Sequence, residues 1–353
     1  MAEKHKANNR SKETAEKLLR LKEEAAELYS EIPTETNAST RKVKKTAAAA
    51  ISAVLLIIAA VIFLNEVFFK SDLIPSWNDL YEEAGLSEGA YDETTDDEIA
   101  VHFIDVGQGD CELIADNGKY ALIDCGEYSE GSKAVSYLDS LGVEKLDYII
   151  ATHPHSDHIG YMGKIINRYE VGAVIMADMR EDMIPSTTSY IKMLEAIDKK
   201  NVPVIFPKVG QSFTLGKGKL KILSPVKAYD DLNNYSVTVK YTYGDNSFLF
   251  TGDIEEEAER DILDYGCDVS ADVLKVAHHG SSTSSTKAFI QSVNPDYAVI
   301  EVGEGNDYNH PHSETLKLFK KLGIEVLRTD RMGSIVFISD GKSLRTVSSK
   351  DGN

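Results

Sequence analysis

Three histidines and an aspartate lie within six consecutive residues of the segment THPHSDHIG, at positions 152–160. They are His153, His155, Asp157 and His158, in a chain that has nine histidines in all. Imidazole nitrogens and carboxylate oxygens are ligands that suit Zn²⁺ and similar divalent ions. The four groups are enough to contribute to two adjacent metal positions. The alternative, a set of solvated loop histidines, is a weaker explanation of such clustering.

A second pair of histidines, His278 and His279, follows the apolar segment VLKVA. Alternation along a strand directs neighbouring side chains to opposite faces. One histidine should therefore face the metals, while the other contacts substrate or fills space. Period two groups His278 with Leu274 and Val276, so if that face is core, His279 is the exposed residue. Both remain candidates for metal binding and for catalysis.

The elements that position these residues are short apolar segments. LDYIIA precedes the histidine cluster, and KYALI precedes Asp124. From Ile99 onward such strand-like segments alternate with helical patterns, among them SKAVSYLDSLG and TTSYIKMLEAIDKKN. Strand-rich sequence punctuated by helices predicts one mixed α/β domain over 98–353, with helices covering packed sheets.

Asp124, at the end of its strand, is interpreted as a carboxylate that accepts a hydrogen bond from a ligand histidine and fixes its tautomer. The alternative is a strand-end aspartate in an Asx turn. GQGDC at 107–111 lacks the third spaced glycine of a dinucleotide site. The chain also has no P-loop and no Gly-x-Ser-x-Gly elbow, which argues against a serine hydrolase.

The first 97 residues have a different character. Residues 1–46 are polar, and helical spacing from Leu18 to Ile32 predicts an amphipathic helix whose partner is unknown. Residues 47–69 are long and apolar enough to cross a bilayer, and residues 70–97 form an acidic linker. Lysines and arginines at 41–45 precede the span, which predicts a single-pass membrane protein with a cytoplasmic N-terminus and an extracytoplasmic body.

Charge is unevenly distributed along the chain, whose formal net charge is −19. Residues 1–46 hold 11 Lys and Arg against 8 Asp and Glu, and the remainder holds 27 against 49. A body this acidic repels polyanions on average, so nucleic-acid binding has to be local, at a metal or a small basic patch. Cys111 and Cys125 fall in neighbouring predicted strands. They are expected either to form a disulfide, if the domain lies outside the cell, or to be buried free thiols.

The motifs together resemble a known family. HPHSDH matches the His-x-His-x-Asp-His signature of the metallo-β-lactamase superfamily, and SFLFTGD supplies its strand-ending aspartate as Asp253. HFIDVGQGDCELI, LKVAHHGS and NPDYAVIEVGEGNDYNHPH look like the hydrolase domain of the competence protein ComEC and its stand-alone relatives. The resemblance, from about residue 100 to 345, implies an αββα sandwich with metals at one edge. His153 and His155 then bind the first metal, Asp157 and His158 the second, and Asp253 bridges them.

One departure from the family pattern concerns the first metal. Most dinuclear members have a further histidine before the bridging aspartate, but no histidine lies between His158 and His278. The sequence NNYS occupies this interval, where Asn234 and Ser236 are expected to orient a water or contact substrate. The chain is therefore expected to bind one or two divalent ions. Zn²⁺ is the expected metal, and Mn²⁺ is the alternative. The resemblance also favours His310 near the site.

These features predict a membrane-anchored, metal-dependent hydrolase that uses metal-activated water, with Asp157 and His278 or His279 in catalysis. The resemblance suggests a phosphodiester or other small anionic substrate, nucleic acid included. The alternatives are a β-lactam or other amide or ester hydrolase, and a surface-anchored binding protein without catalysis. Four basic residues are expected to assist an anionic substrate if they line the cleft: Lys275, Lys287, Arg328 and Arg331.

Overall fold

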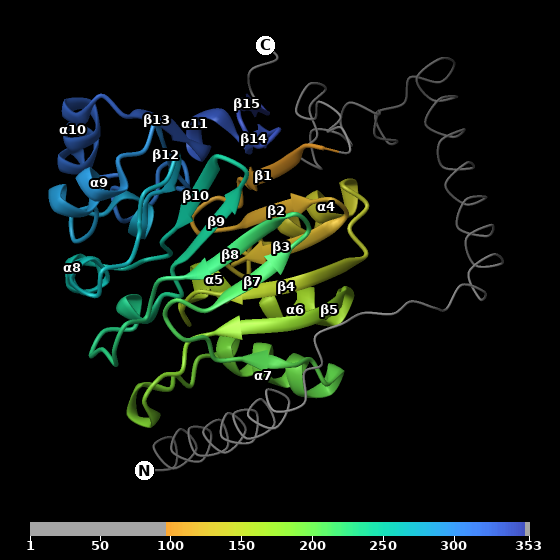
Figure 1. Ribbon diagram of the computed structural model, residues 1–353. Coiled ribbons are helices and arrows are strands. Elements are labelled where there is room, and N and C mark those ends of the chain that lie inside the picture. The colour runs from red at the N-terminus through yellow and green to blue at the C-terminus, as the bar shows by residue number, and fades with distance from the viewer. Residues whose placement is uncertain (1–96, 350–353) are drawn as a thin grey trace.

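Two stacked β-sheets with helices on their outer faces form the part of the chain that the computed structural model describes, residues 97–349 (Figure 1). The predicted amphipathic helix, membrane span and all but the last residue of the acidic linker lie outside these residues. Within residues 97–349, no helix is both long and apolar enough to cross a membrane.

The first sheet has eight strands in the order β15-β14-β1-β2-β3-β4-β5-β6. Its antiparallel part joins β15 through β3, whereas β3 to β6 run parallel. The strands are β1 Ile99–Phe103, β2 Glu112–Asp116, β3 Lys119–Ile123, β4 Lys145–Ala151, β5 Glu170–Met176, β6 Val204–Ile205, β14 Ile335–Ser339 and β15 Leu344–Ser348.

The second sheet has seven strands in the order β13-β12-β11-β10-β9-β8-β7, and β10 to β13 run parallel. The strands are β7 Ser212–Leu215, β8 Gly218–Ile222, β9 Val239–Tyr243, β10 Asn246–Phe250, β11 Val273–Lys275, β12 Tyr297–Ile300 and β13 Glu325–Arg328.

Helices connect the parallel strands, because a parallel pair needs a crossover that returns along the face of the sheet. Four of them follow strands of the first sheet: α4 Gly131–Ser140, α5 Ser156–Ile159, α6 Met162–Arg168 and α7 Thr188–Lys200. Three more connect parallel strands of the second sheet: α8 Glu256–Asp264, α9 Lys287–Val293 and α10 Ser313–Leu322. A further helix, α11 Thr329–Met332, lies between β13 of the second sheet and β14 of the first.

The core lies between the two sheets. Phe103 of β1 stacks against Phe250 of β10 with ring centroids 6.0 Å apart, and Phe337 of β14 packs edge-on against Phe103. All three side chains are fully buried. Burying rings of this size from both sheets is a large part of the apolar area that holds the layers together. The arrangement is the predicted αββα sandwich.

The polar residues singled out in the sequence collect at one edge of the sandwich. Asp124 follows β3, the histidine cluster follows β4, Asp253 follows β10, and His278 and His279 follow β11. Strands β3 and β4 are parallel, as are β10 and β11, so their carboxyl ends open on the same edge. Ligand sites in parallel sheets form at this end of the strands.

Candidate metal centre

The histidine cluster is a strand end followed by one helical turn. β4 ends at Ala151, and α5 begins at Ser156 after His155, whose backbone is extended. His153 and His155 lie on the same side, as predicted, with His153 Nε2 3.0 Å from His155 Nδ1. Asp157 and His158 are on α5. Here His158 is buried, whereas the Asp157 side chain is 27 % exposed.

Among residues 97–349, the group of possible ligand atoms that includes histidines comes from Asp110, His158, Asp253 and His279, whose atoms all lie within 4.8 Å of one another. His158 Nε2 is 3.2 Å from Asp253 Oδ2, and His279 Nε2 is 3.8 Å from the same oxygen. Within the described residues, both Nε2 atoms and Asp253 Oδ1 are buried without a hydrogen-bond partner. Buried polar atoms are rarely left unpaired, so these residues fit a cation. The donor set, imidazole with carboxylate, suits a divalent transition metal.

Electrostatics around this group also favour a cation. Burial alone lowers the pKa of His158, but Asp253, Asp110 and Asp124 outweigh it and hold that pKa well above its usual value. His279 behaves in the same way, with burial opposed by Asp253 and Asp110, and its pKa rises to about 10. Paired carboxylates therefore create a negative site that attracts positive charge.

Asp124 makes the contact predicted for it. Its Oδ2 accepts a hydrogen bond from His158 Nδ1 at 2.7 Å and another from the Thr152 hydroxyl at 2.5 Å, while its Oδ1 accepts from Thr152 N at 2.9 Å. With Nδ1 donating to a carboxylate, His158 presents the lone pair of Nε2 to the centre.

The two adjacent histidines are arranged opposite to the strand-alternation prediction. β11 ends at Lys275, and Ala277–Gly280 form a 3₁₀ turn in which His278 and His279 have φ of 52° and 51°. Because the turn breaks the alternation, His279 is buried at 1 % exposure and His278 is the more exposed of the two. His279 Nδ1 donates to the carbonyl of Glu301 at 2.9 Å. Its Nε2 lies 3.4 Å from Asp157 Oδ2, so the buried histidine faces the centre.

The first metal position has fewer converging atoms. His153 Nε2 is 3.8 Å from Asp253 Oδ2, and His153 Nδ1 lies 3.3 Å from the Ser236 hydroxyl. Ser236 also accepts a hydrogen bond from Asp253 N at 3.0 Å, and Asn234 Oδ1 accepts one from Glu255 N at 2.9 Å. The structure thus places Ser236 and Asn234 beneath the cleft, where they hold protein groups and do not line it.

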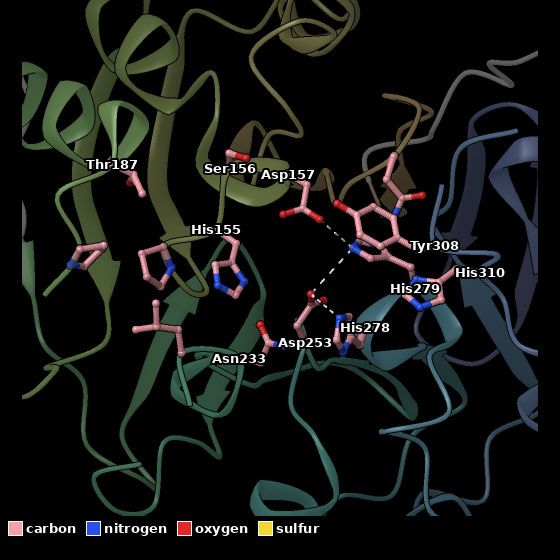
Figure 2. A pocket seen from close by; sticks show the side chains of 14 residues that line it. His155, Ser156, Asp157, Thr187, Asn233, Asp253, His278, His279, Tyr308 and His310 are labelled. Atoms are coloured by element: carbon pink, nitrogen blue, oxygen red, sulfur yellow. Dashed lines mark ion pairs between the residues drawn. The ribbon is translucent and has the colours of Figure 1, made fainter. Parts of the chain in front are cut away.

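A cleft of about 410 Å³ opens onto the centre. Figure 2 shows Asp253 between His278 and His279, with Asp157 opposite and Tyr308 and His310 along one wall. His310 therefore lies near the site, as the resemblance implied, and its ring centroid is 5.6 Å from that of His278.

None of the four basic residues considered for substrate binding lines this cleft. Lys275 is fully buried, and its Nζ donates to Asp110 Oδ2 at 2.6 Å and lies 3.9 Å from Glu301 Oε2. It is therefore the counter-ion of buried carboxylates behind the centre. The Arg328 side chain pairs with Asp330.

Asp110 is the main residue that the sequence did not reveal. Its Oδ1 lies 3.2 Å from His279 Nδ1, and its Oδ2 lies 3.8 Å from His158 Nδ1, so one carboxylate contacts both buried histidines. The available signal was an aspartate, the second after Asp105, at the end of the glycine loop 107–110 and just before β2. Asn233 and Tyr308 also line the cleft without having been predicted. All three cysteines are free, and Cys111 and Cys125 are buried.

An αββα sandwich with a histidine–aspartate centre at one edge, between its two sheets, defines a class of metal-dependent hydrolases. Residues 104–303 match the metallo-beta-lactamase superfamily, and the chain belongs to that family.

Within the superfamily, the chain is similar to competence proteins. It is 32 % identical over 258 residues to ComE operon protein 3 of Bacillus subtilis. The aligned region covers 67 % of this chain and 32 % of that protein. It is 28 % identical to competence protein ComA of Neisseria gonorrhoeae, over 72 % of this chain and 34 % of that protein. The chain thus spans about a third of these relatives' length. The fold is also similar to that of YhfI from B. subtilis, at 15 % identity, with a TM-score of 0.48 and coverage of 68 % of this chain and 100 % of that one.

Proposed function

We propose that this chain is a metal-dependent phosphodiesterase, anchored in a membrane by residues 47–69 with its hydrolase domain outside the cytoplasm. The observation that carries the reaction type is the convergence of buried, unpartnered atoms of His158, His279 and Asp253 at the floor of an open cleft. His158, His279 and Asp253 would hold a divalent ion, Zn²⁺ or Mn²⁺, which would supply Lewis acidity and lower the pKa of water to about 7. The competence relatives and the ComEC-like motifs support a phosphodiester substrate.

The two adjacent histidines have separate roles in this proposal. His279 is buried, bonded to the protein through Nδ1 and directed at Asp157 and Asp253, which suits a ligand. His278 lines the cleft, with Nδ1 3.4 Å from Glu255 Oε1. A histidine held through one nitrogen and open to the cleft suits proton donation to a leaving oxygen. Asp157 orients the attacking water or completes the ligand set.

Metal analysis and hydrolysis assays on the full chain test the reaction type. We expect the purified protein to carry Zn²⁺ or Mn²⁺ and to hydrolyse bis-p-nitrophenyl phosphate. Asp253→Asn and Asp157→Ala should lower the rate by at least about a hundredfold, given the several kcal/mol that such ligands contribute. Asp264→Asn, in an exposed position at the end of α8, is the control and should leave it unchanged.

Three outcomes contradict the proposed reaction. Metal-free protein, or full activity in Asp157→Ala, excludes the mechanism. Turnover of the β-lactam nitrocefin without phosphodiesterase activity selects the lactamase alternative. For the membrane arrangement, protease added to intact cells should cut within the acidic linker at 70–97, and complete protection of that segment reverses the orientation.

A further inference from the structure

A groove between α6 and α7 gathers positive charge on an otherwise acidic domain. It is a hollow of about 320 Å³ lined by Lys164, Lys192 and Lys199, with Glu195 as the acidic side chain in its lining. All three lysines are exposed, and none is in an ion pair with a carboxylate among residues 97–349. Lys145 elsewhere on the same domain is, by contrast, paired with Glu170 at 2.8 Å. Lys199 Nζ donates to the amide oxygen of Asn167 at 3.3 Å, a neutral partner, so none of the three charges is neutralised by a described carboxylate and all three can meet an anion.

Sequence spacing builds the groove. Lys192 and Lys199 are seven residues apart on α7, which places them on one helical face. Lys164 stands on the opposite rim, on α6. Between the rims, a Cβ built on Gly163 would lie 2.8 Å from the carbonyl oxygen of Lys192, so the two helices meet closely at a residue without a side chain. The two helix backbones therefore approach closely in the groove, which the lysines line.

An aromatic ring lies at one end of the groove. Tyr128, in the loop between β3 and α4, lines the groove and is 45 % exposed. The ammonium of Lys192 lies 4.8 Å from its ring centroid, and the ring of Tyr161 is 5.5 Å away. An exposed ring beside lysines is the combination used by proteins that bind single-stranded nucleic acids, where bases stack and phosphates meet cations.

The groove and the metal cleft are separate hollows that lie along the same elements, α5 and α7. Thr187, which precedes α7, lines the cleft, and Lys199 stands twelve residues farther along the helix. At about 1.5 Å of rise per residue this separation is about 18 Å. Gly160, at the end of α5, lines the groove, and the same turn carries Asp157 and His158. The groove thus borders the turn that carries two residues of the metal centre, which is where a polymer would have to pass to reach it.

We propose that this lysine groove, outside the catalytic centre, binds the phosphate backbone of a single-stranded nucleic acid while Tyr128 stacks on a base. The inference rests on the proposed phosphodiesterase function, because it assigns the polymer that the cleft would cleave. The acidity of the domain agrees with this proposal. Because the average field of the domain repels polyanions, a nucleic acid can bind only where positive charge is gathered locally, as in this groove.

The test compares two triple charge reversals in the full chain, each lowering the net charge equally. The groove variant carries Lys164→Glu, Lys192→Glu and Lys199→Glu. The control carries substitutions at exposed lysines that line none of the described hollows: Lys208→Glu, Lys287→Glu and Lys342→Glu. Anisotropy of a fluorescein-labelled oligothymidylate is measured in EDTA, so that binding is separated from cleavage.

For the groove variant we expect at least a tenfold rise in Kd. The slope of the logarithm of the association constant against the logarithm of the salt concentration should also become shallower by about 2, because each of the three lost phosphate contacts contributes about 0.7. Tyr128→Ala should raise Kd about tenfold, whereas Tyr128→Phe, which keeps the stacking face, should not. Hydrolysis of bis-p-nitrophenyl phosphate, too small to reach the groove, should be unchanged in all of these variants.

Equal binding by the groove variant and the control overturns the proposal, as does a wild-type chain that does not bind the oligonucleotide. If inorganic polyphosphate binds as tightly and Tyr128→Ala has no effect, the ligand is a phosphate polymer and the nucleic-acid assignment fails. If binding depends on the groove lysines but the wild type does not hydrolyse the small diester, the binding site stands and the proposed catalytic function fails.

Discussion

Replacing Lys275 tests how the buried charges behind the metal centre are balanced. Its side chain is fully buried, and its Nζ donates to Asp110 at 2.6 Å. Two more buried carboxylates, Glu112 and Glu301, belong to the same cluster. Lys275→Met keeps most of the side-chain volume but removes the one cation of this group, so that the carboxylates are left facing one another.

The expected loss of stability is large. Removing one partner of a buried ion pair costs about 3–5 kcal/mol, because the remaining charge stays desolvated without compensation. For a domain of this size, each kcal/mol lowers Tm by about 2–4 °C, which gives a fall of roughly 6–20 °C. Asp110→Asn added to Lys275→Met should recover much of this loss, since it removes the uncompensated charge.

Urea unfolding followed by circular dichroism in EDTA measures the effect without a contribution from bound metal. Lys240→Met is the matched control: Lys240 lies on the second sheet and pairs with Asp268 at 2.8 Å, but that carboxylate is 66 % exposed. Such a pair contributes at most about 1 kcal/mol. If Lys275→Met unfolds at the same urea concentration as Lys240→Met, the counter-ion role of Lys275 is wrong.

Three further substitutions separate positioning from packing. Asp124→Asn should weaken metal binding about 10–100-fold in a chelator competition, because His158 loses a charged acceptor, and unchanged affinity would contradict this role. Gly109→Ala should destabilise the fold by about 1–3 kcal/mol and reduce hydrolysis, since φ is 135° and the new Cβ would lie 2.2 Å from Asp157 O. Asn234→Ala should cost about 1 kcal/mol with an unchanged rate per folded molecule, and a slower rate would place Asn234 in the cleft.

Local patterns were sufficient to predict much of the fold. The helical spacing in SKAVSYLDSLG and TTSYIKMLEAIDKKN corresponds to α4 and α7, and the apolar segment before the histidine cluster is β4. A contact between Asp124 and a ligand histidine was also predictable, because Asp124 follows β3 and the histidine cluster follows the neighbouring parallel strand β4. In each case the relevant interaction is set by spacing within one element or by the shared end of two strands.

Burial of charged residues was not predictable in the same way. Lys275 reads as a basic residue beside a site, and its internal role depends on Asp110, 165 residues away in sequence. The exposure of His278 and His279 depends on where the backbone leaves the strand conformation, which is after Lys275. The alternation of side chains along a strand does not predict where that strand ends. Tertiary contacts decide both features, so a pattern along one strand cannot supply them.

The missing histidine between His158 and His278 has a consequence for metal stoichiometry. His153 and His155 face each other at 3.0 Å, and no histidine from the interval 159–277 joins them. In contrast, His158 and His279 converge on Asp253 with buried atoms that have no hydrogen-bond partner among residues 97–349. We therefore expect one tightly held ion per chain, retained in His155→Ala and lost in His158→Ala, by elemental analysis after dialysis. Loss of the ion in His155→Ala with retention in His158→Ala would place the tight position at the first pair. Two ions per wild-type chain after dialysis would mean that two histidines and a shared aspartate suffice for the first position.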